Sequence, residues 1–387
     1  MRVLICFDKF KDSMSAQEAG AIVQAALGEV HAEMTTETVP LADGGDGFCE
    51  IMTRAQDGVP ERHAVGGSLG EPVEAQLGWV DGAGLGRATF AHLKLGSSSR
   101  IAIIEMAQVT GLQSLPPDRR DCWKTTSSGT GELIRIATER GADAILLGVG
   151  GSSTNDLGLG ALEALGLSFC ARDGQPLRPI RPELWPSVDH MEGNLPQNLP
   201  PIKIACDVQN PLFGPQGAAA IFGPQKGLKP EDFDRMESLG KKMARLLCDY
   251  LGKPWELTEI PGSGAAGGIT FGLSAACQVE LMPGFDLVSR WLDLPGKLDR
   301  CDWLITGEGR FDLSSLQGKG PGTLALQALA LGKKVSIMAG KIEVTADALP
   351  GGGQNLDLME ISPRDVPLHL ALEREPENLR HAVLKNF

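Results

Sequence analysis

The first residues of the chain pass from a short apolar run into a longer segment with apolar side chains at helical spacing. Residues 3–7 form the apolar run, which predicts a buried strand, and the helical spacing extends to residue 27. Ser15 stands at the start of this predicted helix with Glu18 three residues later, which is typical of a capping box. Gly28 is expected to end the helix. The chain is thus predicted to open with a strand and a capped helix.

The pattern then continues with a second strand and helix before it changes. Residues 36–41 read as a strand and residues 48–55 as a helix, so the opening favours a parallel sheet covered by helices. Residues 62–105 instead alternate between apolar and polar positions, and Asp81-Gly82 is a turn signal within them. This alternation predicts antiparallel structure and the start of a second domain.

Strand and helix patterns alternate again in the middle of the chain. The expected helices are 131–139, 157–165 and 232–251, the expected strands are 144–149 and 202–206, and residues 176–201 form a proline-rich surface excursion. The strand at 144–149 breaks into a polar turn before the next helix, an arrangement that suits an anion site.

Two late apolar runs close the pattern. Residues 304–306 and 335–338 read as buried parallel strands that could return the chain to the first sheet. We therefore predict the α/β class with two domains. One is a Rossmann-like parallel α/β/α domain formed by residues 1–61 plus 290–387, and the other is a mixed α/β domain, residues 62–289, inserted between them.

Composition restricts the partners. A chain of 387 residues exceeds what one core usually holds, which supports two domains. A formal net charge of -13 argues against nucleic acid and anionic membrane as partners, because both would repel the protein. A single tyrosine and 5% aromatic residues argue against a stacking platform for bases.

Cysteine usage indicates a reducing compartment. The eight cysteines are scattered and form no CxxC pair, so reduced, buried thiols are expected. The N-terminal apolar run is short and is followed by charges, so we interpret it as a first strand and not as a signal peptide. With no run of 18 apolar residues, a cytoplasmic location is the expectation.

Several catalytic motifs are excluded. The chain lacks a Walker A loop, HExxH, HRD and DFG, which removes P-loop kinases, zinc proteases and protein kinases. A GxSxG occurs at residues 66–70, but it stands between two strand-like segments and not at a strand-to-helix turn. We interpret it as a chance match.

Glycine-bounded polar turns follow predicted strands or precede predicted helices. Their chemistry-bearing parts are Asp43, Asp46, residues 125–132, Ser152, Thr154, Asn155, Asp156, Asp207, Asn210, Lys226, residues 262–268, Glu308, Arg310, Asp312 and Lys319. Any one turn is equally well explained by helix capping. Together they supply N–H groups for phosphate, cations, and carboxylates for Mg2+ or for deprotonating an alcohol. Phosphoryl transfer needs these parts, because its catalysis is mostly positioning and charge neutralisation.

Eight short blocks extend over nearly the whole chain. They are Asp8–Lys11 (DKFK), Pro40–Gly47 (PLADGGDG), Thr125–Ile134 (TTSSGTGELI), Gly150–Asp156 (GGSSTND), Ala205–Leu212 (ACDVQNPL), Ile221–Gly227 (IFGPQKG), Pro261–Gly268 (PGSGAAGG) and Thr306–Asp312 (TGEGRFD), the last followed by Gly318-Lys319. In this order the blocks resemble bacterial glycerate kinases of the type unrelated to P-loop kinases. The resemblance implies ATP-dependent phosphorylation of D-glycerate to a phosphoglycerate with Mg2+. It also implies two α/β domains with the active site in the cleft between them.

Residue roles are expectations at this point. Asp207, after a buried strand, is the first candidate for the general base, with Asp156 as its rival and Lys11 as a further catalytic residue. The candidate metal ligands are Asp43, Asp46 and Glu308. The candidate substrate- or phosphate-binding residues are Asp8, Gly44, Gly45, Ser127, Gly129, Thr130, Gly150, Gly151, Ser152, Thr154, Asn155, Asn210, Lys226, Gly267, Gly268, Arg310 and Lys319.

Alternatives stay open. The resemblance leans to 2-phosphoglycerate, but 3-phosphoglycerate, or a different small hydroxy acid as acceptor, is compatible with the same residues. A non-catalytic sensor of a sugar acid or nucleotide, and a hydrolase using Ser68, are rivals from other classes. The substrates are small molecules, and a homo-oligomer is an open option.

Overall fold

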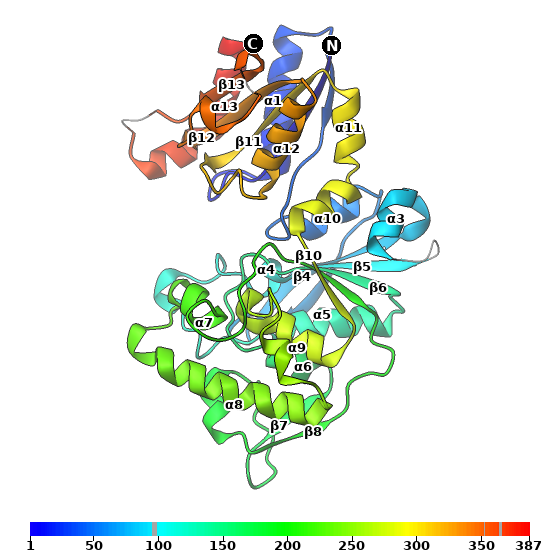
Figure 1. Cartoon of the computed structure of the whole chain (residues 1–387), viewed down its shortest axis with the longest axis vertical. Coiled ribbons are helices and arrows are strands. Elements are labelled where there is room, and N and C mark those ends of the chain that lie inside the picture. Colours follow the sequence, from blue (N-terminus) through cyan, green and yellow to red (C-terminus); the bar gives the residue numbers. More distant parts are fainter. Residues whose placement is uncertain (95–98, 352, 364–365) are drawn as a thin grey trace. The chain divides into compact units, whose positions relative to one another are not determined.

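The computed structural model describes residues 1–94, 99–351, 353–363 and 366–387, and the chain divides into two compact units (Figure 1). The first unit contains residues 1–43 and 285–387, and the second contains residues 44–284. Each unit has its own sheet and covering helices, so the predicted α/β class is confirmed.

The first unit contains a five-stranded, wholly parallel sheet in the order β13-β12-β11-β1-β2. Its strands are β1 (Arg2–Phe7), β2 (Thr35–Thr38), β11 (Trp303–Phe311), β12 (Lys334–Ile342) and β13 (Leu356–Glu360). The late strands β11 and β12 do return to the sheet begun by β1, with Phe7 beside Gly307 in register. The two chain ends therefore build one sheet.

Helices cover the sheet of the first unit according to the direction of each crossover. They are α1 (Ala16–Val30), α10 (Gly284–Trp291, of which Gly284 is the last residue of the second unit), α11 (Leu294–Arg300), α12 (Gly320–Ala330) and α13 (Leu368–Asn386). The chain moves one way from β1 to β2 and the opposite way from β11 to β12, so right-handed crossovers place α1 and α12 on opposite faces. Alternate residues of β1 pack with α1 and α13 in one apolar cluster.

The first helix matches its predicted start but not its predicted end. Ser15 and Glu18 form the expected capping box. The helix continues past Gly28 to Val30, and the His31 N–H bonds to the Leu27 carbonyl. Gly28 lies at negative φ and stays in the helix, so the prediction that it ends the helix is wrong.

The second unit contains a six-stranded sheet in the order β10-β9-β6-β5-β4-β3. Its strands are β3 (Glu61–Gly66), β4 (Pro72–Asp81), β5 (Arg100–Glu105), β6 (Ala144–Gly148), β9 (Ile202–Ala205) and β10 (Val279–Met282). The strands β3, β4 and β5 pair antiparallel, as the alternating pattern predicted, and β5, β6, β9 and β10 pair parallel. The parallel half has its carboxyl ends at one edge.

The second unit has eight α-helices in its described residues, and α4 to α9 contribute side chains to a large apolar core. These helices are α2 (Phe48–Arg54), α3 (Arg87–Leu93), α4 (Met106–Thr110), α5 (Ser128–Glu139), α6 (Leu159–Ala164), α7 (Ala218–Phe222), α8 (Phe233–Leu251) and α9 (Ile269–Ala276). Asp81-Gly82 does not make a hairpin turn. The Asp81 carboxylate instead accepts from the Ala83 N–H and starts a short 3-10 helix that leads into α3.

The limits of the two units differ from the predicted domain limits at the first crossing of the chain. Residues 44–61, predicted for the first domain, belong to the second unit. The reason is that α2 buries Phe48, Cys49 and Met52 and packs against β4 and β5. At the second crossing the chain returns at residue 285, close to the predicted 290.

A separate two-stranded sheet forms at the proline-rich excursion. Its strands are β7 (Leu167–Cys170) and β8 (His190–Gly193), which pair antiparallel with Cys170 opposite His190. α8 packs beside β8 (Figure 1). The chain between residues 170 and 190 thus leaves and returns at one end of this small sheet.

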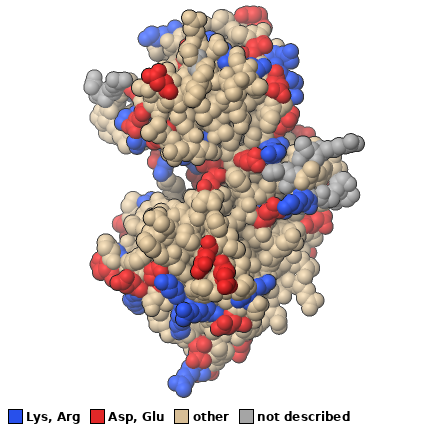
Figure 2. Space-filling model, in the orientation of Figure 1, with Lys and Arg blue, Asp and Glu red and all other residues tan. Residues whose placement is uncertain are grey.

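The surface and the cysteines agree with the composition. Acidic and basic side chains lie interspersed on the face shown in Figure 2. All eight cysteines are free thiols. Among the described residues, no helix has both the length and the apolar character needed to cross a membrane.

Candidate active site

Several carboxylates of the first unit lie near the carboxyl ends of two neighbouring strands, from which the chain continues to opposite sides of the sheet. Asp8 follows β1 directly, and Glu308 lies on β11, one residue beyond the partner of Phe7. The neighbours β1 and β11 send their chains to opposite sides, so this is the switch point where ligands bind in open α/β sheets. Asp43 comes from the loop after β2, which runs beside β1 through the Leu41 N–H bond to Phe7.

Two of these carboxyl groups, Asp8 and Glu308, have a raised pKa. Burial raises the pKa of Asp8 to about 7, and the charges of Asp43 and Glu308 add to this rise while Lys9 opposes it. Burial also raises the pKa of Glu308, against the influence of Ser315 and Lys319. One Glu308 carboxylate oxygen is buried with no hydrogen-bond partner in the described part of the chain.

The predicted cations of the first unit have different surroundings. Lys319 is exposed at the N-cap of α12 and its charge acts on Glu308. Arg310 pairs with Glu343 and lies 3.5 Å from Asp312, with its side chain 62% exposed. Lys11 is exposed. Lys319 is therefore the predicted cation that the fold brings to the carboxylates.

In the second unit, a glycine-rich loop crosses the carboxyl ends of the parallel strands. Gly150 donates its N–H to the Gly44 carbonyl at 3.0 Å. Gly44 has a φ of +93°, and a Cβ there would lie 2.7 Å from the Cβ of Ala205. Only glycine fits such an approach without displacement. The PLADGGDG block thus spans the unit boundary, with Asp43 in the first unit and Asp46 in the second.

A buried lysine donates hydrogen bonds to the polar turn after β6. Lys226 is 2% exposed, and its Nζ donates to Ser152 Oγ at 2.9 Å and to the Thr154 carbonyl at 2.7 Å. Burial lowers the pKa of Lys226 to about 8, with Cys122 and Asp156 opposing the fall. Lys226 therefore positions residues 150–156 through its own hydrogen bonds. The sequence predicted that Lys226 contacts phosphate or substrate, and in the structure its ammonium is hydrogen-bonded to this turn.

Asp156 is enclosed in this turn. It is fully buried, and its carboxylate accepts from Ser127 N, Ser127 Oγ, Gly158 N and Gly160 N. Burial raises the pKa of Asp156, and the Ser127, Gly160 and Gly158 donors oppose that rise. The carboxylate joins the starts of α5 and α6.

Asp207 has the opposite surroundings. It lies two residues beyond the end of β9 and is exposed, and its Oδ1 accepts from Gly284 N at 2.7 Å. The nearby Asn210 is bonded within its own loop, where the side-chain amide donates to the Gln216 carbonyl. Of the two candidate bases, Asp207 is the one that solvent and a substrate can reach.

Other predicted binding residues pack inside the second unit. Ser127 and Thr130 are fully buried, and Gly129 packs on the Gly66 backbone. Gly267 has a φ of +70°, and a Cβ there would lie 2.0 Å from the Thr154 carbonyl oxygen. Gly268 lies beside Leu157. These segments support the turn at 150–156 by close packing.

Three hydroxyl or amide oxygens near this turn have no hydrogen-bond partner in the described residues. They belong to Thr130, Thr154 and Asn155 and are buried. Ser68, in the loop between β3 and β4, is buried too, and its Oγ lies 2.8 Å from Ser153 Oγ. The GxSxG segment is therefore a loop between two strands, without the geometry of a nucleophile elbow.

One buried acid was missed by the sequence reading. Glu105 ends β5, is 3% exposed, and accepts from Cys49 N and from Gln108 Nε2, both at 3.1 Å. Burial raises its pKa to about 7, with Asp46 adding to the rise. Its bond to Cys49 ties α2, and the glycine loop before it, to the sheet. A lone glutamate closing the apolar run RIAIIE was the available signal.

The site chemistry defines a class before any comparison. Acids and an exposed lysine at a Rossmann-like switch point, with an exposed aspartate after a parallel strand, suit an α/β enzyme that handles phosphorylated ligands. The glycerate kinase family model matches residues 3–386, and the chain belongs to that family. It is therefore an enzyme that phosphorylates glycerate, as the sequence blocks implied.

Individual relatives agree with the family. The chain is 35% identical to "Glycerate kinase" of Bacillus subtilis over 97% of this chain and 94% of the relative. It is 37% identical to "Glycerate 2-kinase" of Escherichia coli over 88% of this chain and 86% of the relative. Among solved structures, a putative glycerate kinase 2 from Salmonella typhimurium matches with a TM-score of 0.77 at 34% identity, covering 99% of this chain and 96% of that one.

Proposed function

We propose that the protein transfers a phosphoryl group from ATP to D-glycerate in the presence of Mg2+ and releases 2-phosphoglycerate. The observation that carries the proposal is the exposed Asp207, held at the end of β9 by the Gly284 N–H. A carboxylate that is held by a backbone donor and is open to solvent suits a general base, since it must accept a proton from a bound alcohol. The name of the Escherichia coli relative supports the 2-hydroxyl as acceptor.

Asp8, Asp43 and Glu308 are the ligands we propose for a divalent cation, and because their oxygens do not all lie within 4.8 Å of one another in the described structure, the carboxylates would have to draw together around the ion. Oxygen ligands are what Mg2+ prefers, one Glu308 oxygen is buried without a hydrogen-bond partner in the described residues, and the nearby acids add to the raised pKa of Asp8. Mg2+ held there would neutralise charge on phosphate oxygens. Asp46, the third ligand expected from sequence, belongs to the second unit, and Asp8 takes its place in this proposal.

The turn at 150–156 is proposed to bind and orient an anionic group. Its exposed residue is Gly151, at a φ of +69°, and a Cβ there would lie 3.6 Å from Asp46 Oδ1. Lys226 fixes Ser152 and Thr154 from the buried side. Asp156 fixes the adjoining helix starts. These two residues act by positioning and do not exchange protons with the substrate.

Product analysis tests the proposal. ATP consumption is measured with D-glycerate and Mg2+, and the phosphoglycerate isomers are resolved by phosphorus NMR. We expect a single 2-phosphoglycerate signal that requires all three components. A single 3-phosphoglycerate signal would overturn the assigned acceptor hydroxyl, and binding of D-glycerate without ATP turnover would overturn the catalytic proposal.

A further inference from the structure

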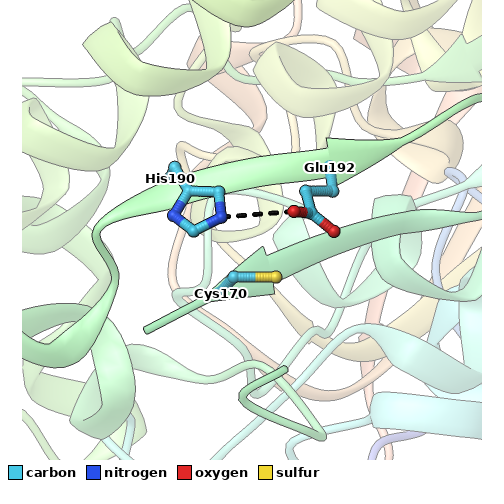
Figure 3. A group of neighbouring side chains, drawn as sticks. All are labelled: Cys170, His190 and Glu192. Carbon is cyan, nitrogen blue, oxygen red and sulfur yellow. Dashed lines mark hydrogen bonds and ion pairs between the residues drawn. The ribbon is translucent and has the colours of Figure 1, made fainter. Parts of the chain in front are cut away.

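Three side chains of the small β7–β8 sheet present different metal-binding atoms to one another. They are the Cys170 thiol, the His190 imidazole and the Glu192 carboxylate (Figure 3). One ligand atom from each lies within 4.8 Å of the others, and in the described part of the chain this is the one group of three or more such residues that meets this spacing. None of them belongs to the site described above.

The backbone fixes this arrangement. Cys170 and His190 are direct partners in the antiparallel ladder, and Glu192 lies two residues further along β8. Side chains of partner residues lie on the same face of a sheet, as do residues two apart in a strand. The Asp189 N–H also bonds to the Cys170 carbonyl at 2.9 Å. The three ligands therefore project together from regular structure.

The distances suit a small tetrahedral ion. His190 Nε2 and Glu192 Oε1 lie 3.3 Å apart. Nitrogen and oxygen ligands at tetrahedral zinc bond lengths lie roughly 3.4 Å from each other. The other ring nitrogen of His190 lies 3.3 Å from Asp189 Oδ2, the carboxylate–histidine arrangement that orients metal-binding imidazoles.

We propose that Cys170, His190 and Glu192 bind a zinc ion, with water in the fourth position. Sulfur, nitrogen and oxygen donors in this combination suit zinc, whereas Mg2+ and Ca2+ prefer oxygen alone. Cys170 is buried, His190 half-buried and Glu192 exposed, so the ion would lie at the surface with solvent access.

The site has a structural consequence. Residues 171–189 leave β7 at Cys170 and return at His190, so the ion would join both ends of this excursion. A metal that closes a loop stabilises the folded state, because its binding free energy is available only when the ligands are together. We expect zinc to raise the thermal midpoint and to protect this segment from proteolysis.

Metal titration of the full-length chain tests the proposal. Chelator-treated protein is titrated with Zn2+ against a chromophoric chelator, with Mg2+ present throughout to occupy oxygen-only sites. Co2+ replaces Zn2+ in a parallel titration, because a cobalt–thiolate bond adds a charge-transfer absorption. We expect one ion per chain, the charge-transfer band, and a rise in thermal midpoint.

Variants decide which residues bind. Cys170→Ser, His190→Gln and Glu192→Gln should each weaken Zn2+ binding by at least about tenfold, and Cys170→Ser should abolish the charge-transfer band. Two controls should leave binding unchanged: His63→Gln, since His63 pairs with Glu61 at 3.5 Å without a grouped thiol, and Cys277→Ser.

Two results would overturn the site. One is the absence of a charge-transfer band in the wild-type chain. The other is unchanged Zn2+ affinity in the ligand variants. If Cys170→Ser or His190→Gln fails to fold, the exposed Glu192→Gln decides the matter, and unchanged affinity in that variant would reject the proposal.

Discussion

Two aspartates at the same edge of the second unit's sheet differ in what surrounds them. Asp156 follows β6, is fully buried, and accepts four hydrogen bonds. Asp207 follows β9, is exposed, and accepts a hydrogen bond from the backbone N–H of Gly284. Both stand in glycine-bounded polar turns that look alike in sequence. The comparison teaches that residue type and strand-end position do not separate a structural carboxylate from a reactive one; the donors around it do.

The largest expected effect on stability is at Asp156. Asp156→Ala leaves the Ser127 N–H and hydroxyl and the Gly158 and Gly160 N–H groups without their acceptor in a buried place. We expect a loss of about 3–5 kcal/mol in the free energy of unfolding, measured by urea denaturation. Asp156→Asn keeps one acceptor oxygen and should lose less. A loss below about 1 kcal/mol in Asp156→Ala would remove the structural role.

The next largest effect is expected at Lys226, as a pH dependence of the free energy of unfolding. Its folded pKa of about 8 lies below the unfolded value of 10.5, so the folded state disfavours the proton and stability gained from this group rises as pH increases from 8 towards 10.5. Relative to Lys226→Met, the wild-type free energy of unfolding should rise by about 2 kcal/mol between pH 8 and 10. Lys229→Met, at an exposed position, is the control. Parallel pH profiles for wild type and Lys226→Met would contradict the buried ammonium.

Asp8 should set the pH dependence of Mg2+ binding. Because burial, Asp43 and Glu308 raise its pKa to about 7, a proton competes with the cation below that pH. Mg2+ affinity, measured by calorimetry, should rise about tenfold from pH 6 to 8. In metal-free protein the sign reverses, and stability should fall as pH rises from about 4 to 7.

The control for that titration is the exposed Asp12. Asp12→Asn should keep the pH dependence of Mg2+ affinity, whereas Asp8→Asn should bind weakly and at one level across the range. A wild-type affinity that does not change between pH 6 and 8 would argue against Asp8 as a ligand.

The smallest effect concerns the backbone next to Asp156. Leu157 has a φ of +58°, a region that costs a side chain about 1 kcal/mol, yet the residue is buried at 3% exposure. Both Leu157→Ala and Leu157→Gly lose the apolar contact, but only glycine relieves the backbone. Leu157→Gly should therefore be more stable than Leu157→Ala by about 1 kcal/mol in thermal denaturation. If Leu157→Ala were instead the more stable variant, the backbone at residue 157 would be able to leave the positive-φ region, and the prediction would be wrong.

Local patterns were sufficient for much of the fold. The capping box at Ser15, the antiparallel β3–β4–β5 and the return of β11 and β12 to the first sheet all follow from periodicity and strand ends. Gly28 was misread because nothing local forces its backbone out of the helix. The limit of the first unit was misplaced because α2 is held by β4 and β5, contacts that appear only in the folded chain.

The sequence predicted the turns that make up the candidate site, but not which of their side chains are bonded within the protein and which are open to a ligand. The partners of Lys226 are Ser152 and Thr154, which lie 74 and 72 positions before it in the sequence. Ser127 lies 29 positions from its partner Asp156, so neither set of hydrogen bonds can be read from sequence spacing. The sequence therefore predicted a ligand contact for Lys226 and a catalytic role for Asp156. Glu105 was overlooked since its backbone donor, Cys49, lies 56 positions away in the sequence.

The most direct test of this account is the turnover of Asp207→Asn per folded molecule. Asparagine keeps the oxygen that accepts from Gly284 but cannot take a proton at neutral pH. The account predicts a fall in kcat of about 10²- to 10⁴-fold with D-glycerate and ATP, and an unchanged unfolding midpoint. Turnover within about threefold of wild type would contradict the role of Asp207 and return the question of the base to the other carboxylates.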